Sequence, residues 1–224
     1  MMKTMLPARM LDRLTGALAL YLARPIGHPL QVPACDRQRL AATLDRGDVL
    51  LCDGNTRAAA LVKRVTRSTW SHVSMYVGPL EAGPDPRCIV EADFAAGVRA
   101  IRLSELNALQ VRVLRPVRLS DEHRRLLAEW VVSRIGSEYD LAQAWFLGRS
   151  LLRLPVRARS RSSPDATTAS STRFICSSLL AQAFALVGYP IQPDTPLVGR
   201  AAAIDYRNVT PGDFEHALAL EMIG

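Results

Sequence analysis

The feature that most constrains the fold is a series of short segments between residues 49 and 114, each bounded by turn residues. In residues 71–78, S-H-V-S-M-Y-V-G, the apolar side chains alternate with others, which is typical of a strand with one buried face. Four further segments are short and largely apolar: residues 49–52, 88–92, 97–103 and 111–114. Strands this short and this close together predict an antiparallel meander.

Four longer segments carry apolar residues at helical spacing: 56–69, 120–135, 141–152 and 175–187. The second has the clearest boundaries, because Ser120 can cap its first turn and Gly136 can end it. Helices and strands together predict an α+β fold with a small antiparallel sheet packed against helices.

The rest of the chain lacks such periodicity. Residues 25–46 contain three prolines and are expected to be loop-like, with a short helical stretch after the prolines, and residues after 188 are expected to be rich in loops. Residues 155–173 are rich in Ser, Thr, Arg and Pro and predict a mobile insert. At 224 residues the chain is expected to form one domain, residues 46–224, after a lead-in at 1–45.

Residues 9–23 place apolar side chains at helical spacing between basic flanks. The apolar run is too short to cross a bilayer, and Asp12, Arg13 and Arg24-Pro25 around it are atypical of a cleaved export signal. We expect an amphipathic helix that either packs on the domain or lies on an anionic membrane surface. The expected location is cytoplasmic or peripheral to the inner membrane, with export as a further alternative.

The net charge of +7 fits an anionic partner or simply an arginine-rich solvated surface. No basic run is interleaved with stacking aromatic residues, so no nucleic-acid partner is expected. The four cysteines form no C-x-x-C pair and have no metal-ligand spacing, and we interpret them as free thiols. The sequence also lacks H-E-x-x-H and a phosphate-binding glycine loop, so neither a metal nor a cofactor is expected.

Cys176 lies at the first turn of the predicted helix 175–187. The unpaired amides and the dipole at a helix N-terminus favour a thiolate there, especially beside a histidine. This placement makes Cys176 a candidate nucleophile. The alternative is a small buried helix residue, which is common for cysteine.

His72 lies at the start of a predicted strand and is the candidate base for Cys176. Glu91 lies in the apolar strand I-V-E-A, where a carboxylate needs a partner. That partner would be the second ring nitrogen of the histidine, or else an arginine in a salt bridge. Asp93 is the second candidate orienter, because it shares a strand face with Glu91.

These residues stand in segments that resemble a known family when taken in order. The segments are R-G-D-V-L-L, W-S-H-V-S-M-Y-V-G, I-V-E-A, G-V, E-Y-D-L and I-C-S-S-L-L-A-Q-A-F. They resemble the YiiX/YebB-like group of circularly permuted NlpC-like cysteine peptidases, which is also similar to lecithin retinol acyltransferase-like proteins. The resemblance covers residues 47–188. It implies a papain-like α+β fold in which the His strand precedes the Cys helix and the sheet packs against that helix.

The resemblance also implies functional roles. It makes Cys176 the nucleophile, His72 the base and Glu91 the orienter, and it places Tyr139 of E-Y-D at the active site. Ser177 is a further candidate substrate-binding or oxyanion residue. This group often has Glu or Gly after the cysteine, so Ser177 and the long insert leave the substrate open, and the insert could act as a lid.

The candidate residues and the resemblance are compatible with three functions. The first is hydrolysis of an amide bond, possibly in cell-wall peptides, through an acyl-enzyme on cysteine. The second is acyl chemistry on a lipid, as a thioesterase, phospholipase or acyltransferase at a membrane surface. The third is a non-enzymatic binding module. The expected partner is thus a peptide or lipid acyl substrate, and the oligomeric state cannot be predicted from the sequence.

Overall fold

A computed structural model of the chain describes residues 20–26, 34–106, 108, 110–140, 173–191, 206 and 209–223. Most of the predicted N-terminal helix at residues 9–23 lies outside these ranges. So do the predicted helix at residues 141–152 and all but the last residue of the predicted insert at 155–173. No helix among the described residues is long and apolar enough to cross a membrane.

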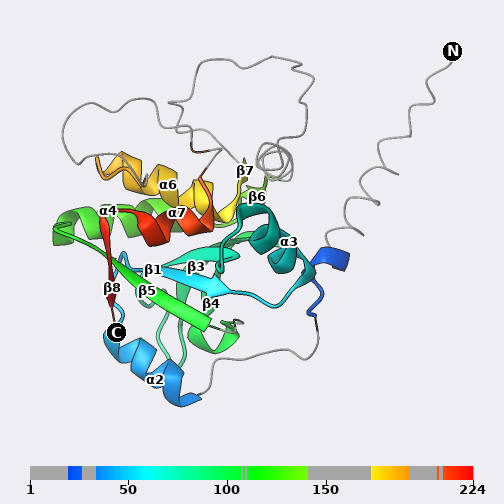
Figure 1. The fold of residues 1–224 in the computed structure, drawn as a ribbon. Helices are drawn as coiled ribbons and strands as arrows, with labels where there is room; N and C mark the ends of the chain where they lie inside the picture. Colours follow the sequence, from blue (N-terminus) through cyan, green and yellow to red (C-terminus); the bar gives the residue numbers. More distant parts are fainter. Residues whose placement is uncertain are drawn as a thin grey trace, which may run out of the picture.

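Six strands form one sheet in the order β4-β3-β2-β1-β5-β8 (Figure 1). The strands are β1 (Val49–Asp53), β2 (His72–Tyr76), β3 (Arg87–Asp93), β4 (Gly97–Arg102), β5 (Gln110–Pro116) and β8 (Leu220–Ile223). Every pairing is antiparallel, as predicted. Strands β1 to β4 form the expected meander, but the prediction is wrong for β5. After the 3-10 turn η1 (Leu103–Glu105) the chain crosses back, and β5 pairs with the far side of β1.

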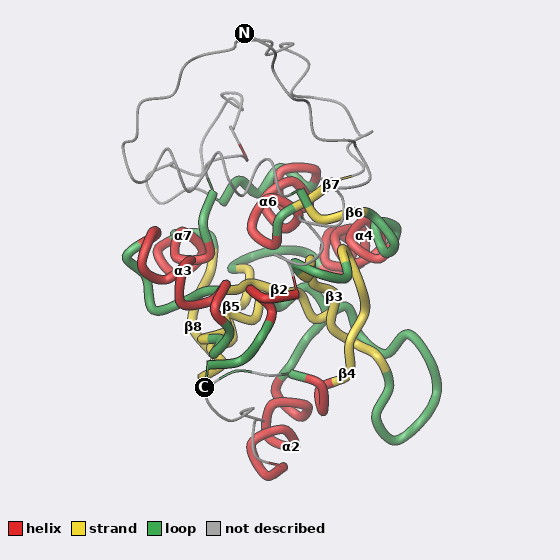
Figure 2. The backbone as a smooth tube through the Cα atoms, turned by 90° about the vertical axis from the view of Figure 1, so that its right-hand side faces the viewer, coloured by secondary structure: helices red, strands yellow, loops and turns green. Residues whose placement is uncertain are grey.

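Helices lie on both sides of this sheet, as the two backbone views show (Figures 1 and 2). They are α2 (Ala34–Thr43), α3 (Arg57–Thr66), α4 (Asp121–Val132), α6 (Cys176–Leu186) and α7 (Pro211–His216). The core between the sheet and α4, α6 and α7 includes Val49, Leu51, Val73, Met75, Val90, Leu127, Leu180 and Phe214. The opposite face buries Leu50, Cys52, Ile89 and Val113, with Leu40 of α2 packed against them. Burial on both faces explains why residues 49–52 are apolar without alternation.

The start of α4 follows from its sequence, but its end does not: the helix ends at Val132 with Ser133 as C-cap, before the predicted stop at Gly136. The Ser120 hydroxyl accepts a hydrogen bond from the His123 amide at 3.3 Å, so the predicted N-cap is confirmed. Helix α6 packs against both β2 and α4, and most of its residues are buried. A helix that is apolar around most of its circumference is typical of an interior position.

The C-terminal tail differs from its prediction as a loop-rich segment, because it contains α7 and β8. Phe214 of α7 is fully buried, and β8 extends the sheet beside β5. Both elements are too short for a periodic pattern to show in the sequence.

A buried carboxylate fixes the start of β1. Asp48, in the R-G-D segment, is fully buried and accepts hydrogen bonds from Nε and Nη2 of Arg115 at 2.9 and 2.7 Å. Its Oδ2 also accepts from the Asp45 amide at 2.8 Å. This network joins the turn before β1 to the end of β5.

Candidate active site

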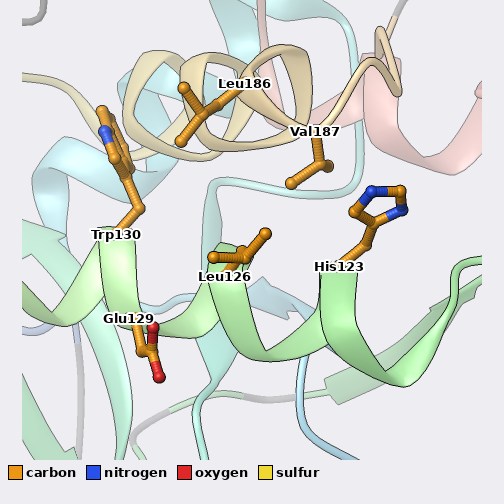
Figure 3. Close-up of a pocket in the computed structure, with 6 residues that line it drawn as sticks. All are labelled: His123, Leu126, Glu129, Trp130, Leu186 and Val187. Carbon is orange, nitrogen blue, oxygen red and sulfur yellow. The ribbon is translucent and has the colours of Figure 1, made fainter.

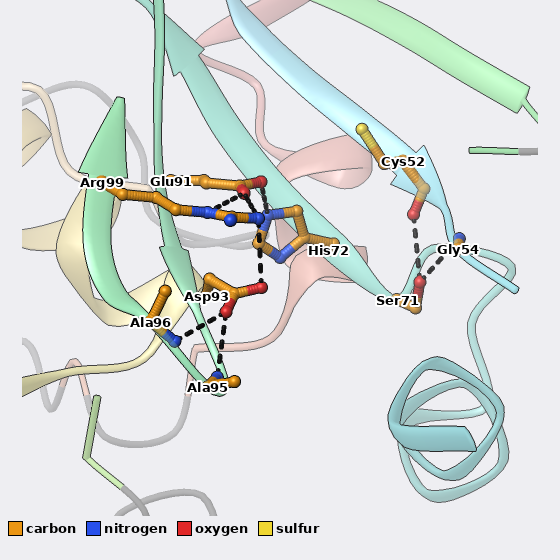
Figure 4. Close-up of polar contacts among 9 residues, drawn as sticks. All are labelled: Cys52, Gly54, Ser71, His72, Glu91, Asp93, Ala95, Ala96 and Arg99. Atoms are coloured by element: carbon orange, nitrogen blue, oxygen red, sulfur yellow. Dashed lines mark hydrogen bonds and ion pairs between the residues drawn. The ribbon is translucent and has the colours of Figure 1, made fainter. Parts of the chain in front are cut away.

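His72 and Glu91 are brought together by neighbouring strands of the sheet. His72 is the first residue of β2, and Glu91 lies in the middle of β3. His72 Nε2 donates a hydrogen bond to Glu91 Oε2 at 2.8 Å (Figure 4). The Glu91 side chain is only 9% exposed, whereas that of His72 is 25% exposed. A buried carboxylate therefore holds one ring nitrogen of an imidazole that is itself partly exposed.

Cys176 is the first residue of α6, which packs against β2. Its side chain is largely buried and lies close enough to His72 to raise the pKa of the imidazole through hydrogen bonding and charge. Because Nε2 of the ring is bonded to Glu91, the nitrogen left for the sulfur is Nδ1. The thiol, the imidazole and the carboxylate thus lie in the sequence order His, Glu, Cys but in the spatial order Cys, His, Glu.

Opposing effects set the protonation of this cluster. Burial lowers the pKa of His72, but its hydrogen bonds and charge interactions with Cys176 and Glu91 outweigh burial and hold the pKa well above its usual value. Burial raises the pKa of Glu91, but His72 and then Arg99 outweigh it, so the net shift is downward. The geometry therefore favours an imidazolium beside an ionised carboxylate.

Arg99 is a member of the cluster that the sequence did not single out. It lies on β4 directly opposite Glu91, and its Nε and Nη2 donate to Glu91 Oε1 at 3.0 and 2.8 Å. The sequence left open whether Glu91 orients the histidine or pairs with an arginine, and the structure shows both contacts. Only the register of the β3–β4 hairpin, from Asp93↔Gly97, could have indicated this arginine.

Asp93, the second candidate orienter, has other partners. Its Oδ1 accepts from the amides of Ala95 and Ala96 at 2.9 and 2.8 Å, which closes the β3–β4 turn (Figure 4). Its Oδ2 lies 3.4 Å from Arg99 Nη2. Asp93 therefore supports the turn and the arginine, and Glu91 is the carboxylate on the histidine.

Tyr139 lies close to the start of the cysteine helix. Strand β6 (Glu138–Tyr139) pairs in parallel with β7 (Arg173–Phe174), and Tyr139 is opposite Phe174, two residues before Cys176. The Tyr139 ring packs on Phe94 with 5.1 Å between centroids. Burial, and then the negative charges of Cys176 and two aspartates, raise the pKa of Tyr139 well above its usual value. Its hydroxyl is thus a neutral donor beside the cysteine.

The Ser177 hydroxyl is not positioned to bind a substrate. The side chain is buried, and its Oγ donates to the Val209 carbonyl at 2.5 Å. This bond anchors α6 to the segment before α7. The predicted role for Ser177 is therefore limited to its backbone amide, which lies in the first turn of α6.

The other described cysteines are poor nucleophiles. Cys52, Cys88 and Cys176 are all free, and the side chain of Cys35 lies outside the described part of the chain. Cys52 is the cross-strand partner of His72, and burial strongly raises its thiol pKa. Burial also raises the pKa of Cys88, to about 11. Both thiols therefore stay protonated at neutral pH.

A surface hollow of about 600 Å³ lies between α4 and α6 (Figure 3). Its lining residues are His123, Leu126, Glu129, Trp130, Leu186 and Val187. None of them belongs to the Cys176 cluster, so the hollow is not part of this site.

The chain matches the family described as the permuted papain-like amidase enzymes of the YaeF/YiiX, C92 family over residues 43–146. The predicted family resemblance is confirmed. The match to this permuted papain-like family includes His72, Glu91 and Tyr139 and ends before Cys176. It supports a hydrolase as the general function.

The fold is also similar to a solved structure of the same group. The crystal structure described as the metalloprotein YiiX from Escherichia coli O157:H7 superposes with a TM-score of 0.55 and 18% sequence identity. The similarity covers 81% of this chain and 97% of that chain. At this identity it shows the papain-like α+β fold. A search of curated proteins gave no match. Among the described residues of this chain, no group of three His, Cys, Asp or Glu side chains could hold a metal ion.

Proposed function

We propose that the protein is a cysteine hydrolase that cleaves an amide bond through an acyl-enzyme. The observation that carries this proposal is the position of His72, which contacts Cys176 on one side and Glu91 on the other. A thiol, an imidazole and a carboxylate in this order can generate a nucleophile and then transfer its proton. The family match, whose description names an amidase, supports hydrolysis as the reaction class.

In the proposed reaction, His72 accepts the proton of Cys176, and the thiolate forms a C–S bond with the substrate carbonyl carbon. Collapse of the tetrahedral intermediate breaks the C–N bond, and His72 gives its proton to the leaving amine. His72 then takes a proton from water, whose oxygen attacks the thioester. Collapse of the second tetrahedral intermediate breaks the C–S bond, the carboxylic acid leaves, and His72 returns its proton to Cys176. Throughout, Glu91 keeps the ring oriented through Nε2.

The negative oxygen of the intermediate needs hydrogen-bond donors. Two groups beside Cys176 are suited to this role: the neutral hydroxyl of Tyr139 and the amides of the first turn of α6, including that of Ser177. We propose these as the oxyanion donors.

We propose a peptide amide, such as one in a cell-wall peptide, as the substrate class, and an acyl ester of a membrane lipid as the second candidate. The two are distinguished by incubating the protein with cell-wall peptides and, separately, with phosphatidylglycerol vesicles. A new primary amine supports the first candidate. Released fatty acid without peptide cleavage would establish the second.

The test of the catalytic pair is alkylation by iodoacetamide, compared between the intact protein and His72→Ala. We expect Cys176 of the intact protein to react at pH 6 at least about tenfold faster than in His72→Ala, because an imidazolium stabilises the thiolate. Mass spectrometry of the labelled peptide measures the rate, and Cys176→Ala shows the background from other thiols. Equal rates in the two proteins would mean that the residues are not coupled, and the proposal would fail.

A further inference from the structure

We propose that Arg99 is a positioning residue of this site, which fixes Oε1 of Glu91 so that Oε2 stays on His72, and which keeps Glu91 ionised throughout the reaction. The inference rests on the proposed function for the role of His72. It adds to that site a residue on β4 that acts on the imidazole and the thiol only through the carboxylate between them.

The first argument is the division of the two Glu91 oxygens. Nε and Nη2 of Arg99 both donate to Oε1, whereas Oε2 accepts from His72. Because Glu91 and Arg99 are cross-strand partners on β3 and β4, the sheet itself sets their spacing. A carboxylate held on one oxygen by a planar fork cannot rotate without breaking both bonds. Arg99 of β4 thus keeps Oε2 of Glu91 oriented toward His72.

The second argument is the charge balance during the reaction. Glu91 is 9% exposed, and a carboxylate with so little solvent needs a compensating positive charge. His72 provides one only while it is protonated, and in the proposed reaction it becomes neutral each time it gives up its proton. Arg99 stays protonated at every pH at which proteins fold. It therefore keeps Glu91 charged in the steps in which His72 is neutral.

The third argument is that Arg99 is itself held in place. Its Nη2 lies 3.4 Å from Asp93 Oδ2, and Asp93 is fixed by the amides of the β3–β4 turn. In Figure 4 the Arg99 side chain extends beside Glu91 to reach both carboxylates. The pKa of Glu91 is lowered despite its burial, and Arg99 contributes to that effect after His72. The charged and titratable groups around Glu91 are His72 on β2, Asp93 on β3, Arg99 on β4, Cys52 on β1 and Cys176 on α6.

The test follows the Glu91 carboxyl directly, by NMR of protein labelled with ¹³C at the glutamate carboxyls. Its signal is assigned by its absence in Glu91→Gln. We expect Glu91 to titrate at higher pH in Arg99→Met than in the intact protein, because the nearest permanent positive charge is gone. Arg87→Met is the matched control, since it removes an arginine of β3 that pairs with Glu81 on the surface. It should leave the Glu91 titration unchanged.

A second readout separates positioning through Glu91 from a direct effect on the histidine. The ¹⁵N titration of the His72 ring should differ between the intact protein and Arg99→Met. In the Glu91→Gln background, where the carboxylate is absent, adding Arg99→Met should leave the His72 titration unchanged. Arg99→Lys keeps the charge but loses the fork, so the Glu91 titration should stay close to that of the intact protein. If Arg99→Met does not fold, Arg99→Gln takes its place as the uncharged variant.

A Glu91 titration that is the same in Arg99→Met and Arg87→Met would overturn the inference, as would an effect of Arg99→Met that persists in Glu91→Gln. If Arg99→Gln is the uncharged variant, a Glu91 titration that is the same in Arg99→Gln and in Arg99→Lys would also overturn the inference. None of these measurements needs a substrate. Failure of the hydrolase proposal would appear as Cys176 alkylation that does not depend on His72, and the two outcomes are therefore distinguishable.

Discussion

At the scale of single residues, one imidazole joins the two halves of the site. His72 lies between a thiol from the C-terminal half of the chain and a carboxylate from the sheet. Both neighbours raise the pKa of the imidazole through hydrogen bonds and charge. The charge state of His72 therefore depends on both neighbours.

This arrangement predicts a pH-dependent contribution of His72 to stability. Because its folded pKa is raised above its unfolded value, the stabilisation is fully present below the unfolded pKa and is lost as pH rises through the folded pKa. We therefore expect the free energy of unfolding of the intact protein to exceed that of His72→Gln more at pH 6 than at pH 10. Urea unfolding at the two pH values measures this difference.

The control for that experiment is His123→Gln. His123 is exposed at the start of α4, and its backbone amide, which the substitution keeps, makes the N-cap bond. Measured at the same two pH values, this variant shows what the loss of a histidine outside the site does to the free energy of unfolding. A His72→Gln effect that grows as pH rises would contradict the raised pKa.

At the scale of elements, the β3–β4 hairpin holds both carboxylates and also supports Tyr139. Gly97 begins β4 with a φ of +74°, and a Cβ there would lie 2.4 Å from the Ser137 carbonyl oxygen. That oxygen accepts from the Val98 amide at 2.8 Å, just before β6. The hairpin and the strand of Tyr139 are thus in direct backbone contact, and this contact leaves no room for a side chain.

We expect Gly97→Ala to destabilise the protein by about 2–4 kcal/mol, the sum of left-handed backbone strain and a backbone clash. Gly188→Ala is the matched control, because Gly188 has a similar φ of +71° but no described atom within 4 Å of the added Cβ. It should cost only about 1 kcal/mol. Urea unfolding measures the free energy of unfolding of both variants. Equal losses of stability would show that the close approach of the Ser137 carbonyl adds nothing to the cost of Gly97→Ala.

Another connection between elements is the buried Asp48, which binds Arg115 of β5. We expect Asp48→Ala to cost about 3–5 kcal/mol, since it leaves a partly buried guanidinium without its main partner. Asp45→Ala removes an exposed carboxylate from the same arginine, at 3.1 Å, and should cost less than about 1 kcal/mol. Denaturant unfolding compares the two variants. Equal losses would mean that burial of Asp48 does not matter.

At the scale of the whole molecule, the sequence predicted the antiparallel sheet, the capped helix α4 and the contact of His72 with Glu91. These features depend on local periodicity, on capping residues and on a family resemblance carried by contiguous segments. Arg99 was missed because its relation to Glu91 depends on hairpin register, which no local pattern indicates. The return of β5 to β1, and the elements α7 and β8, were missed because they depend on long-range packing or are too short.

The order of the site residues along the chain has a consequence for biosynthesis. His72, Glu91, Arg99 and Tyr139 all precede Cys176, and α6 joins the sheet only after residues 173–176 have been made. A ribosome-bound chain that is still shorter than this carries the proposed base and its carboxylate but not the proposed nucleophile. Folding of contacts so distant in sequence is also slow, because loop closure must come first. Under the proposed mechanism, the emerging polypeptide therefore cannot hydrolyse a substrate until α6 has left the ribosome, and hydrolytic activity appears late in maturation.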